Sequence, residues 1–339
     1  MTIMSSDYKI DAVIIWVDGN DPEWQKQRAK YLPEQRTDYR PERYRDMGIL
    51  KYWFRGIDVY APWLNTIHFV TNGQVPTWLN GNAPRLHLVF HRDYMPSQYL
   101  PTFSANPIEL NLHRIDGLSE RFIYFNDDEL IIAPVTPEDF FDGGLPRQAA
   151  SFLPAFFDST DTVFSEILRN DFDLICRHFS RVSFLPFLHK YLSPQNGGMR
   201  TGLRNAKNIF LGIPGIEYSH LAIPFCKSTF SEVWNAEAET LDLTCKHKFR
   251  SADDVNQFIL QYWQIATGKF SPVPEKSRGR YFYLPTSYPD AVKCIKQQQV
   301  KTICLNDGHF LTDGDYCRCK DEITAALDTI LPLKSSFEL

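Results

Sequence analysis

Four short apolar segments in the first 130 residues each end abruptly in a cluster of polar side chains. The segments and their clusters are 11–17 with Asp18-Gly19, 66–71 with Asn72-Gly73, 86–90 with His91-Arg92-Asp93, and 121–125 with Asn126-Asp127-Asp128. Helices are expected between these segments, at about 22–31, 48–60 and 107–114. Alternating strands and helices predict an α/β fold with a parallel sheet, and ligands of such sheets bind beyond the carboxyl ends of the strands. We therefore expect the four polar clusters to share one site.

The second half of the chain has a less regular pattern. Residues 152–157 and 184–192 are aromatic and irregular, whereas 200–211 predict a basic helix and 253–267 an amphipathic helix. Residues 300–305 predict a late strand that ends in Asn306-Asp307. This end repeats the arrangement of a strand followed by an acid seen at residue 127.

Composition excludes several classes of protein. With 339 residues, 43% apolar and 23% charged, the chain has the make-up of an ordinary globular protein, and its net charge of −5 gives no support for nucleic-acid binding. Residues 1–11 form no apolar leader and no run of 18 apolar residues occurs, so we expect a cytoplasmic protein without a transmembrane helix.

The seven cysteines are odd in number and unevenly spaced, and in the cytosol we expect them to stay reduced. Four side chains near the C-terminus, Cys304, His309, Cys317 and Cys319, are of the types that bind zinc. Their spacing fits no usual zinc pattern, which favours a solvated loop that contains thiols.

Asn126, Asp127 and Asp128 are the strongest candidates for a metal site. Adjacent acids at the end of a buried strand can hold a hard divalent cation, Mg²⁺ or Mn²⁺, and such ions commonly bind together with substrate phosphates. A helix cap or a solvated turn would use the same residue types. Both interpretations stay open at this point.

The other candidates are individually weak. Trp16, Asp18 and Gly19 could form a nucleotide pocket or a plain strand-to-turn corner. His220 could act as a general base or could be an ordinary, partly buried histidine. Two arginines, Arg204 and Arg250, could hold phosphate oxygens or lie on the surface.

Several longer blocks of sequence together resemble one known family. The first block is 10–19. The second runs from Arg43 to 128 and includes Ala61-Pro62-Trp63, 70–76, 100–104, Ile108-Glu109 and 122–128. The third is His220 with 248–251, and the fourth is 304–307 with 335–338. In this order they resemble the Stealth family of sugar-1-phosphate transferases. That family includes bacterial capsule and exopolysaccharide enzymes, and the human lysosomal-enzyme N-acetylglucosamine-phosphotransferase is similar in its catalytic core.

The resemblance implies a fold and a set of site residues. It implies a glycosyltransferase-A-like sheet flanked by helices, with residues 1–150 as the nucleotide-sugar and metal-binding half. Residues 151–339 form a more irregular, partly helical acceptor-side half that closes the same site. The implied metal ligands are Asp127, Asp128, Asn306 and Asp307. The residues implied to bind phosphate are Arg204 and Arg250, and the implied base is His220. The residues implied to bind substrate are Trp16, Asp18, Gly19, Arg45 and Asn72.

The implied reaction is transfer of a hexose-1-phosphate from a UDP-sugar to a hydroxyl of an acceptor glycan, with Mg²⁺ or Mn²⁺ and release of UMP. It would serve the synthesis of a bacterial capsular or cell-surface polysaccharide. The acceptor would be lipid-linked or polymeric, so a peripheral contact with the inner face of the membrane is expected. The donor sugar, single addition or polymerisation, and the oligomeric state stay open.

Two rival functions remain. A metal-dependent glycosyltransferase would also use paired acids at a metal but would release UDP instead of UMP. A carbohydrate-binding module would bind oligosaccharide without any dependence on a metal.

Overall fold

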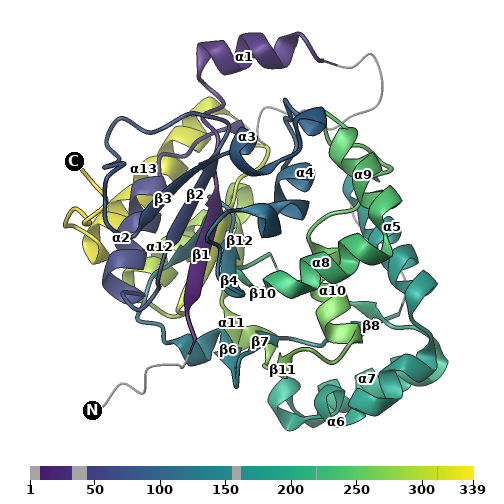
Figure 1. Ribbon diagram of the computed structural model, residues 1–339. Coiled ribbons are helices and arrows are strands. Elements are labelled where there is room, and N and C mark those ends of the chain that lie inside the picture. The colour runs from purple at the N-terminus through teal and green to yellow at the C-terminus, as the bar shows by residue number, and fades with distance from the viewer. Residues whose placement is uncertain (1–7, 33–43, 155–161, 219, 311) are drawn as a thin grey trace.

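A five-stranded sheet lies at the centre of the computed structural model, which describes residues 8–32, 44–154, 162–218, 220–310 and 312–339 (Figure 1). Its strands, in spatial order, are β10 (Ile223–Cys226), β4 (Arg121–Phe125), β1 (Ile10–Ile15), β2 (Ile67–Thr71) and β3 (Leu86–Phe90). The first four strands in chain order are parallel, and β10 joins β4 in the antiparallel direction. The predicted α/β fold with a parallel or mixed sheet is confirmed, and β10 makes the sheet mixed.

Three smaller sheets surround the central one. The first contains β12 (Arg280–Tyr283), β13 (Thr302–Asn306) and β5 (Glu129–Ile131); the second β11 (Ser271–Pro272), β7 (Leu145–Gln148) and β6 (Phe141–Asp142); the third β8 (Phe152–Leu153) and β9 (Gly215–Ile216). Strands β10 and β13 pair with strands from before residue 150. The predicted division at residue 150 stays a prediction, with strands paired across it.

Thirteen α-helices are described outside the gaps listed above. They are α1 (Pro22–Ala29), α2 (Leu50–Tyr60), α3 (His91–Tyr94), α4 (Ala105–Leu110), α5 (Thr162–His178), α6 (Leu188–Tyr191), α7 (Gly198–Leu211), α8 (Lys227–Ala236), α9 (Ala238–Lys246), α10 (Phe258–Ala266), α11 (Glu275–Arg278), α12 (Leu284–Lys296) and α13 (Asp313–Ile330). Five 3-10 turns, η2 (Ser97–Tyr99), η3 (Leu112–Arg114), η4 (Pro137–Asp139), η5 (Arg181–Phe187) and η6 (Pro194–Asn196), connect them. None of the described helices combines the length and apolar character needed to cross a bilayer.

Local sequence explains several of these boundaries. Strand β1 is buried along nearly its whole length, as its continuous apolar run predicts for a strand covered on both faces. At the start of α1 the Asp21 side chain accepts a hydrogen bond from the Trp24 N–H at 2.6 Å, with Pro22 at the first helical position. The helix predicted at 107–114 is divided into α4 and η3.

The helix predicted as amphipathic at 253–267 differs from the prediction. All nine residues of α10 are buried, including Gln261, whose amide donates to the Gln148 side chain at 2.8 Å. The helix begins only at Phe258, because Asp254 is buried before it and accepts hydrogen bonds from Ser251 and Asn106. The aromatic region at 184–192 forms η5 and α6, and residues 155–157 lie outside the described part.

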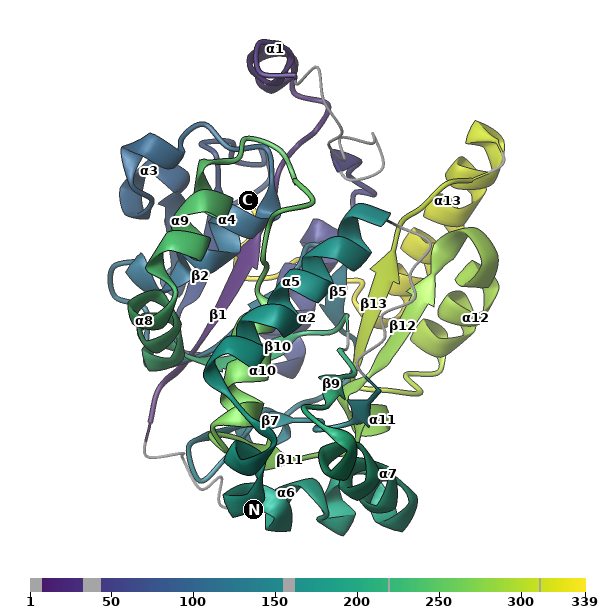
Figure 2. The same cartoon turned by 90° about the vertical axis from the view of Figure 1, so that its right-hand side faces the viewer.

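The C-terminal segment returns to the first half of the chain. Helices α12 and α13 pack with β13 on the α2 side of the molecule, and Figures 1 and 2 both show this group beside the central sheet. The Arg55 guanidinium in α2 binds the Glu338 carboxylate through two hydrogen bonds of 2.8 and 2.9 Å and the Leu331 carbonyl at 2.9 Å. Both members of this ion pair are almost fully buried, so the chain end is held firmly against the sheet layer.

Candidate active site

A cavity of about 1420 Å³ lies beyond the carboxyl ends of β1, β2 and β4. It is larger than a site for a single small molecule, and its lining comes from both halves of the chain. Nine of the predicted site residues line it: Trp16, Arg45, Asn72, Asp127, Asp128, His220, Arg250, Asn306 and Asp307. The polar ends of β2, β3 and β4 line this one cavity through Asn72, His91 and residues 126–128, whereas at β1 Trp16 lines it and the Asp18-Gly19 cluster does not.

Asp127 and Asp128 follow directly after β4 in the cavity wall. Burial, together with the neighbouring carboxylates of Asp128 and Asp46, raises the pKa of Asp127 to about 8. Asp46 is itself shifted upward, because burial raises its pKa and the Asp18 carboxylate adds to the shift. Several carboxyl groups thus lie close together at this end of the sheet and raise one another's pKa.

Asp128 lies against two side chains from the second half. One carboxylate oxygen, Oδ2, accepts from the Cys304 thiol at 3.4 Å, and the same sulfur is 3.7 Å from His220 Nδ1. Ligand atoms of these three residues lie within 4.8 Å of one another. The other oxygen, Asp128 Oδ1, is buried and has no hydrogen-bond partner among the described residues.

These residues fit a hard divalent cation. A buried carboxylate oxygen without a donor is costly unless a cation neutralises it, and oxygen donors are those that Mg²⁺ and Mn²⁺ prefer. Burial and the Asp128 carboxylate raise the pKa of the Cys304 thiol well above its usual value, so the sulfur is protonated and donates to Asp128. A neutral thiol is a poor zinc ligand, which favours an oxygen-based site at Asp127 and Asp128.

A hydrogen-bond network fixes the backbone beside the two aspartates. The Tyr124 hydroxyl lies 2.7 Å from Glu109 Oε1 and 2.9 Å from Asn126 Oδ1. Asn126 in turn donates its backbone N–H to Glu129 Oε2 at 3.0 Å and its side-chain amide to Oε1 at 3.3 Å. Because both the oxygen and the nitrogen of its side-chain amide are hydrogen-bonded, Asn126 stabilises the turn that contains Asp127 and Asp128.

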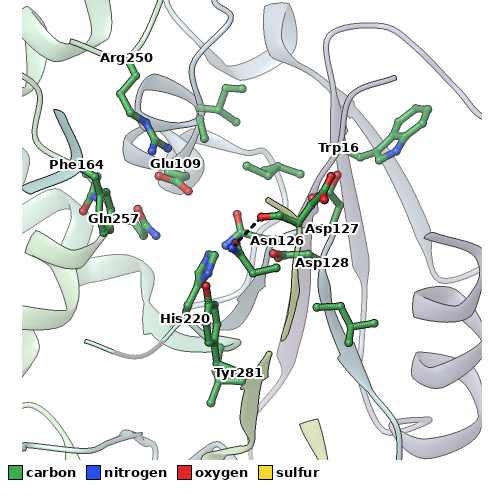
Figure 3. A pocket seen from close by; sticks show the side chains of 18 of the residues that line it. Trp16, Glu109, Asn126, Asp127, Asp128, Phe164, His220, Arg250, Gln257 and Tyr281 are labelled. Atoms are coloured by element: carbon green, nitrogen blue, oxygen red, sulfur yellow. Dashed lines mark hydrogen bonds between the residues drawn. The ribbon is translucent and has the colours of Figure 1, made fainter. Parts of the chain in front are cut away.

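The opposite wall carries the cationic and aromatic groups. Figure 3 shows the Arg250 guanidinium directed toward Glu109, with Gln257 and Phe164 next to them. Burial raises the pKa of Glu109 to about 7, against the opposing effects of the Tyr124 hydroxyl and the Arg250 charge. His220 faces the aspartates, and its ring lies 5.9 Å from the Tyr281 ring, measured between centroids. An arginine and a histidine thus face the acidic end of β4 across one cavity.

Asp307 lines the cavity, but its carboxylate is already occupied. Arg45 Nε donates to Oδ2 at 2.7 Å, Arg45 Nη2 donates to Oδ1 at 2.8 Å, and the Gly308 N–H donates to Oδ1 at 2.7 Å. The Asn306 amide donates to the Asp307 carbonyl at 3.1 Å. Asp307 and Arg45 thus form an ion pair in the cavity wall, and the expected roles of Asp307 and Asn306 as metal ligands and of Arg45 as a substrate-binding residue stay predictions.

Three other predicted residues do not line the cavity. Asp18 accepts a hydrogen bond from the Asn20 N–H at 2.9 Å and thus closes its own turn. A side chain at Gly19 would meet the Tyr44 carbonyl at 2.0 Å, so this glycine is needed for a close backbone approach. Arg204 hydrogen-bonds Ser151 and lies 3.5 Å from Glu217, so its guanidinium is engaged beside the cavity rim.

The four residues considered for zinc do not gather into a ligand cluster in the described part of the chain. The expected solvated loop is also wrong for two of them, because Cys304 is buried in β13 and Cys319 is buried in α13. Cys317 is exposed on α13, and His309 lines the cavity.

The predicted site lacked Glu109 and Tyr281. Glu109 is the only acid of helix α4 and lies between Ile108 and Leu110, and an acid in such an apolar setting is the signal that the sequence alone could have offered. Tyr281 comes from β12, where it alternates with a buried Phe282 and gave no distinct signal. Glu109 and Tyr281 can be recognised as site residues only from the side chains that lie next to them in the folded protein.

Comparisons with known proteins agree with the arrangement just described. The family models for Stealth protein CR1 (conserved region 1) and CR2 (conserved region 2) match residues 8–36 and 43–148. The receptor polysaccharide phosphotransferase WefC of Streptococcus gordonii is 38% identical over 341 residues, covering 98% of this chain and 99% of that protein. The chain belongs to the Stealth family.

Other Stealth relatives are similar over their full length. A capsular polysaccharide phosphotransferase WcwK of Streptococcus pneumoniae is 39% identical over 97% of this chain and 98% of its own, and the exopolysaccharide phosphotransferase cps2G of Lactiplantibacillus plantarum is 33% identical over 98% and 97%. The expected enzyme class, a phosphotransferase, is confirmed by this membership. The metal, the nucleotide-sugar donor and a cytoplasmic location stay predictions.

Among solved structures, the galactosyltransferase LgtC in complex with donor and acceptor sugar analogs is similar with a TM-score of 0.39 and 10% identity, over 94% of this chain and 96% of that chain. The bifunctional glycosyltransferase WbbM has a TM-score of 0.39 and 12% identity, over 96% and 50%.

Proposed function

We propose that this Stealth protein transfers a hexose-1-phosphate from a UDP-sugar to a hydroxyl of an acceptor glycan, in the synthesis of a bacterial capsular or cell-surface polysaccharide. The new bond joins the acceptor oxygen to the β-phosphorus of the donor. The bond between the β-phosphorus and the bridging oxygen breaks, and UMP leaves with that oxygen. The bond between the sugar and its phosphate is untouched.

One observation carries this proposal. The crowded carboxyl groups of Asp127 and Asp128 line the same cavity as Arg250 and His220. Asp127 and Asp128 would hold the divalent cation, which would neutralise the donor diphosphate when bound. Trp16 and Asn72 line the same cavity at the ends of β1 and β2 and would contact the nucleotide.

The residues on the opposite wall would act on the reacting phosphoryl group. Arg250 would bind its oxygens and offset the charge that develops during transfer, with Glu109 orienting the guanidinium. His220 would accept the proton of the attacking hydroxyl, and the nearby Asp128 carboxylate would stabilise the imidazolium that forms. The relatives named as polysaccharide phosphotransferases support this assignment of the reaction class.

Identification of the released nucleotide tests the proposal. The purified protein is incubated with Mg²⁺ or Mn²⁺, an acceptor glycan and a panel of UDP-sugars, and the products are separated by anion-exchange chromatography. We expect acceptor-dependent UMP from one of the donors. Release of UDP would instead establish a glycosyltransferase, and oligosaccharide binding without any nucleotide release would indicate a binding module.

A further inference from the structure

Helix α7 faces the opposite way from an ordinary surface helix. Its buried residues include Asn205 and Asn208, whereas Met199, Leu203 and Phe210 are 80, 67 and 76% exposed. A helix on the surface of a globular protein normally buries its apolar stripe and exposes its polar one. The apolar stripe of α7 is therefore directed away from the protein core.

Specific hydrogen bonds hold the helix in this orientation. The Asn205 amide donates to the carbonyls of Ala150 at 2.7 Å and Tyr191 at 2.8 Å, and its oxygen accepts from the Phe152 N–H at 2.9 Å. The Asn208 amide donates to the Phe152 carbonyl at 2.9 Å. Rotating α7 to bury its apolar stripe would break all four bonds, so the outward apolar stripe is a built feature of the fold.

Neighbouring residues extend the apolar stripe into a patch. Val182 and Leu185 in η5 are 63 and 47% exposed, and Leu211 at the end of α7 is 70% exposed. Arg181 donates to the Phe210 carbonyl at 3.1 Å, which ties η5 to the end of α7. We call this patch the α7 surface; it consists of Val182, Leu185, Met199, Leu203, Phe210 and Leu211. Figures 1 and 2 both show α6 and α7 together at one end of the molecule.

The sequence around the α7 surface is rich in cations and lacks acids, although in space Glu217 lies 3.5 Å from Arg204 and Glu237 lies 3.0 Å from Arg177. Residues 174–216 contain no Asp or Glu, although the whole chain has 41 of them and a net charge of −5. The same stretch contains six cations: Arg177, Arg181, Lys190, Arg200, Arg204 and Lys207. Arg200 and Lys207 are exposed on α7, next to the apolar stripe. An apolar helix face bordered by arginine and lysine is typical of segments that lie in the interface of an anionic bilayer.

The α7 surface is also close to the active-site cavity. Helix α7 packs on β8 through the Asn205 and Asn208 bonds to Phe152, and the next residue, Leu153, lines the cavity. A protein docked through α7 would therefore place on the bilayer a helix that packs against a strand next to the cavity wall. That position suits an acceptor whose glycan is attached to a membrane lipid.

We propose that the α7 surface docks this enzyme onto an anionic bilayer, with the apolar side chains inserted among the lipids and Arg200 and Lys207 on the headgroups. The benefit of docking rests on the proposed function, because it would bring a lipid-linked acceptor to the cavity. The docking itself is a property of the surface and is measured without any turnover.

Vesicle flotation of the full chain tests this proposal. Vesicles of phosphatidylcholine alone are compared with equal mixtures of phosphatidylcholine and phosphatidylglycerol. We expect binding to the anionic vesicles, little binding to the neutral ones, and weaker binding as NaCl is raised from about 0.1 to about 0.5 M. The pair Leu203→Glu with Phe210→Glu should weaken binding to anionic vesicles by about tenfold or more.

Matched variants separate docking from folding. Val59→Glu with Leu243→Glu makes the same chemical change at exposed apolar residues of α2 and α9, and should bind like the wild type. Should the Leu203 and Phe210 pair fail to fold, Arg200→Gln with Lys207→Gln should give the smaller loss and keep the test valid. Each variant should retain wild-type UMP release with a water-soluble acceptor glycan.

The possible failures can be told apart. Absence of wild-type binding to anionic vesicles, or equal binding by the α7 variants, would overturn the docking proposal even if UMP is released. A wild-type dimer that the Leu203 and Phe210 pair converts to monomers, without any vesicle binding, would instead make the α7 surface a contact between copies. Vesicle binding without UMP release would leave docking intact and overturn only the proposed reaction.

Discussion

The dipeptide Asn-Asp ends two strands that contribute to one cavity, and the two aspartates have opposite surroundings. After β4, Asp127 and Asp128 gather with other acids, and Asp128 Oδ1 has no donor among the described residues. After β13, the carboxylate of Asp307 accepts two hydrogen bonds from Arg45 and one from a backbone N–H. The two strand ends have the same Asn-Asp sequence, whereas the charges and hydrogen-bond donors around their carboxylates differ.

The difference shows how a ligand carboxylate can be told from a structural one. A carboxylate whose oxygens already face protein donors needs no further cation, and binding one would require breaking good hydrogen bonds. A buried carboxylate that lacks donors remains unfavourable until a cation arrives. On this criterion we propose the end of β4 as the metal site, whereas Asp307 and Arg45 form an ion pair in the cavity wall that we call the brace.

The largest effect is expected from removing a β4 carboxylate. Asp128→Ala should lower the rate of UMP release by about a thousandfold or more, because the diphosphate would lose its counter-charge. The unfolding temperature of the metal-free protein should change little or rise, since a poorly satisfied buried oxygen is removed. Activity is measured by acceptor-dependent UMP release; near-normal activity of this variant with saturating metal would remove Asp128 from the site.

A somewhat smaller loss is expected on the facing wall. His220→Ala should lower turnover by about a hundredfold to a thousandfold, because the attacking hydroxyl would lose its base. Binding of the UDP-sugar, measured by calorimetry, should persist. Unchanged turnover in this variant would show that His220 is not the base.

The Arg55–Glu338 pair extends the comparison to an ion pair far from the cavity. Glu338→Gln should lower the free energy of unfolding by about 3 kcal/mol at pH 7, because it leaves the buried Arg55 without its counter-charge. The hydrogen bonds and positive charge of Arg55 lower the pKa of Glu338, so the folded state binds fewer protons than the unfolded state. The stability that this pair provides is therefore present above the unfolded carboxyl pKa and is lost as the pH falls through the folded pKa.

Denaturant unfolding of wild type and Glu338→Gln at pH 7 and pH 3 measures this difference. The gap in unfolding free energy between the two proteins should shrink at the lower pH. A gap that stays constant or widens would mean that Glu338 is not held as a carboxylate.

The smallest effect is expected from the brace at β13. Asp307→Asn removes the charge opposite Arg45 but keeps one acceptor oxygen, so the free energy of unfolding should fall by only about 1–2 kcal/mol. UMP release should fall far less than in Asp128→Ala. A loss as large as that of Asp128→Ala, in a folded protein, would return Asp307 to the metal site.

The sequence predicted the parts of the molecule that depend on local pattern. The strands around Val13 and Ile123 were visible as continuous apolar runs, because parallel strands inside a sheet are covered on both faces. The strands around Phe69 and Val89 were visible as apolar runs that contain one histidine each, and β3, at the edge of the sheet, is only partly buried. The same pattern placed Asp127 and Asp128 at a strand end in the cavity, since strand ends of one sheet meet at one edge, and their role as metal ligands stays a prediction.

The remaining features depend on contacts between distant segments. Arg45 and Asp307 are 262 positions apart, so their ion pair was invisible in the sequence. Helix α10 carries polar glutamines and was predicted to be amphipathic, but Gln261 finds a partner in Gln148 and the helix is buried on all sides. Glu109 was overlooked as part of the site for the same reason, because only the fold brings Tyr124 and Arg250 to it.

Titration of Mn²⁺ by calorimetry in the presence of UDP tests the central claim most directly. The wild type and the variants Asp128→Asn and Asp307→Asn are compared at the same pH and protein concentration. Our account predicts one Mn²⁺ site in the wild type, a similar affinity in Asp307→Asn, and a loss of about a hundredfold or more in Asp128→Asn. Equal weakening in both variants, or undiminished binding in Asp128→Asn, would contradict the assignment of the metal to the end of β4.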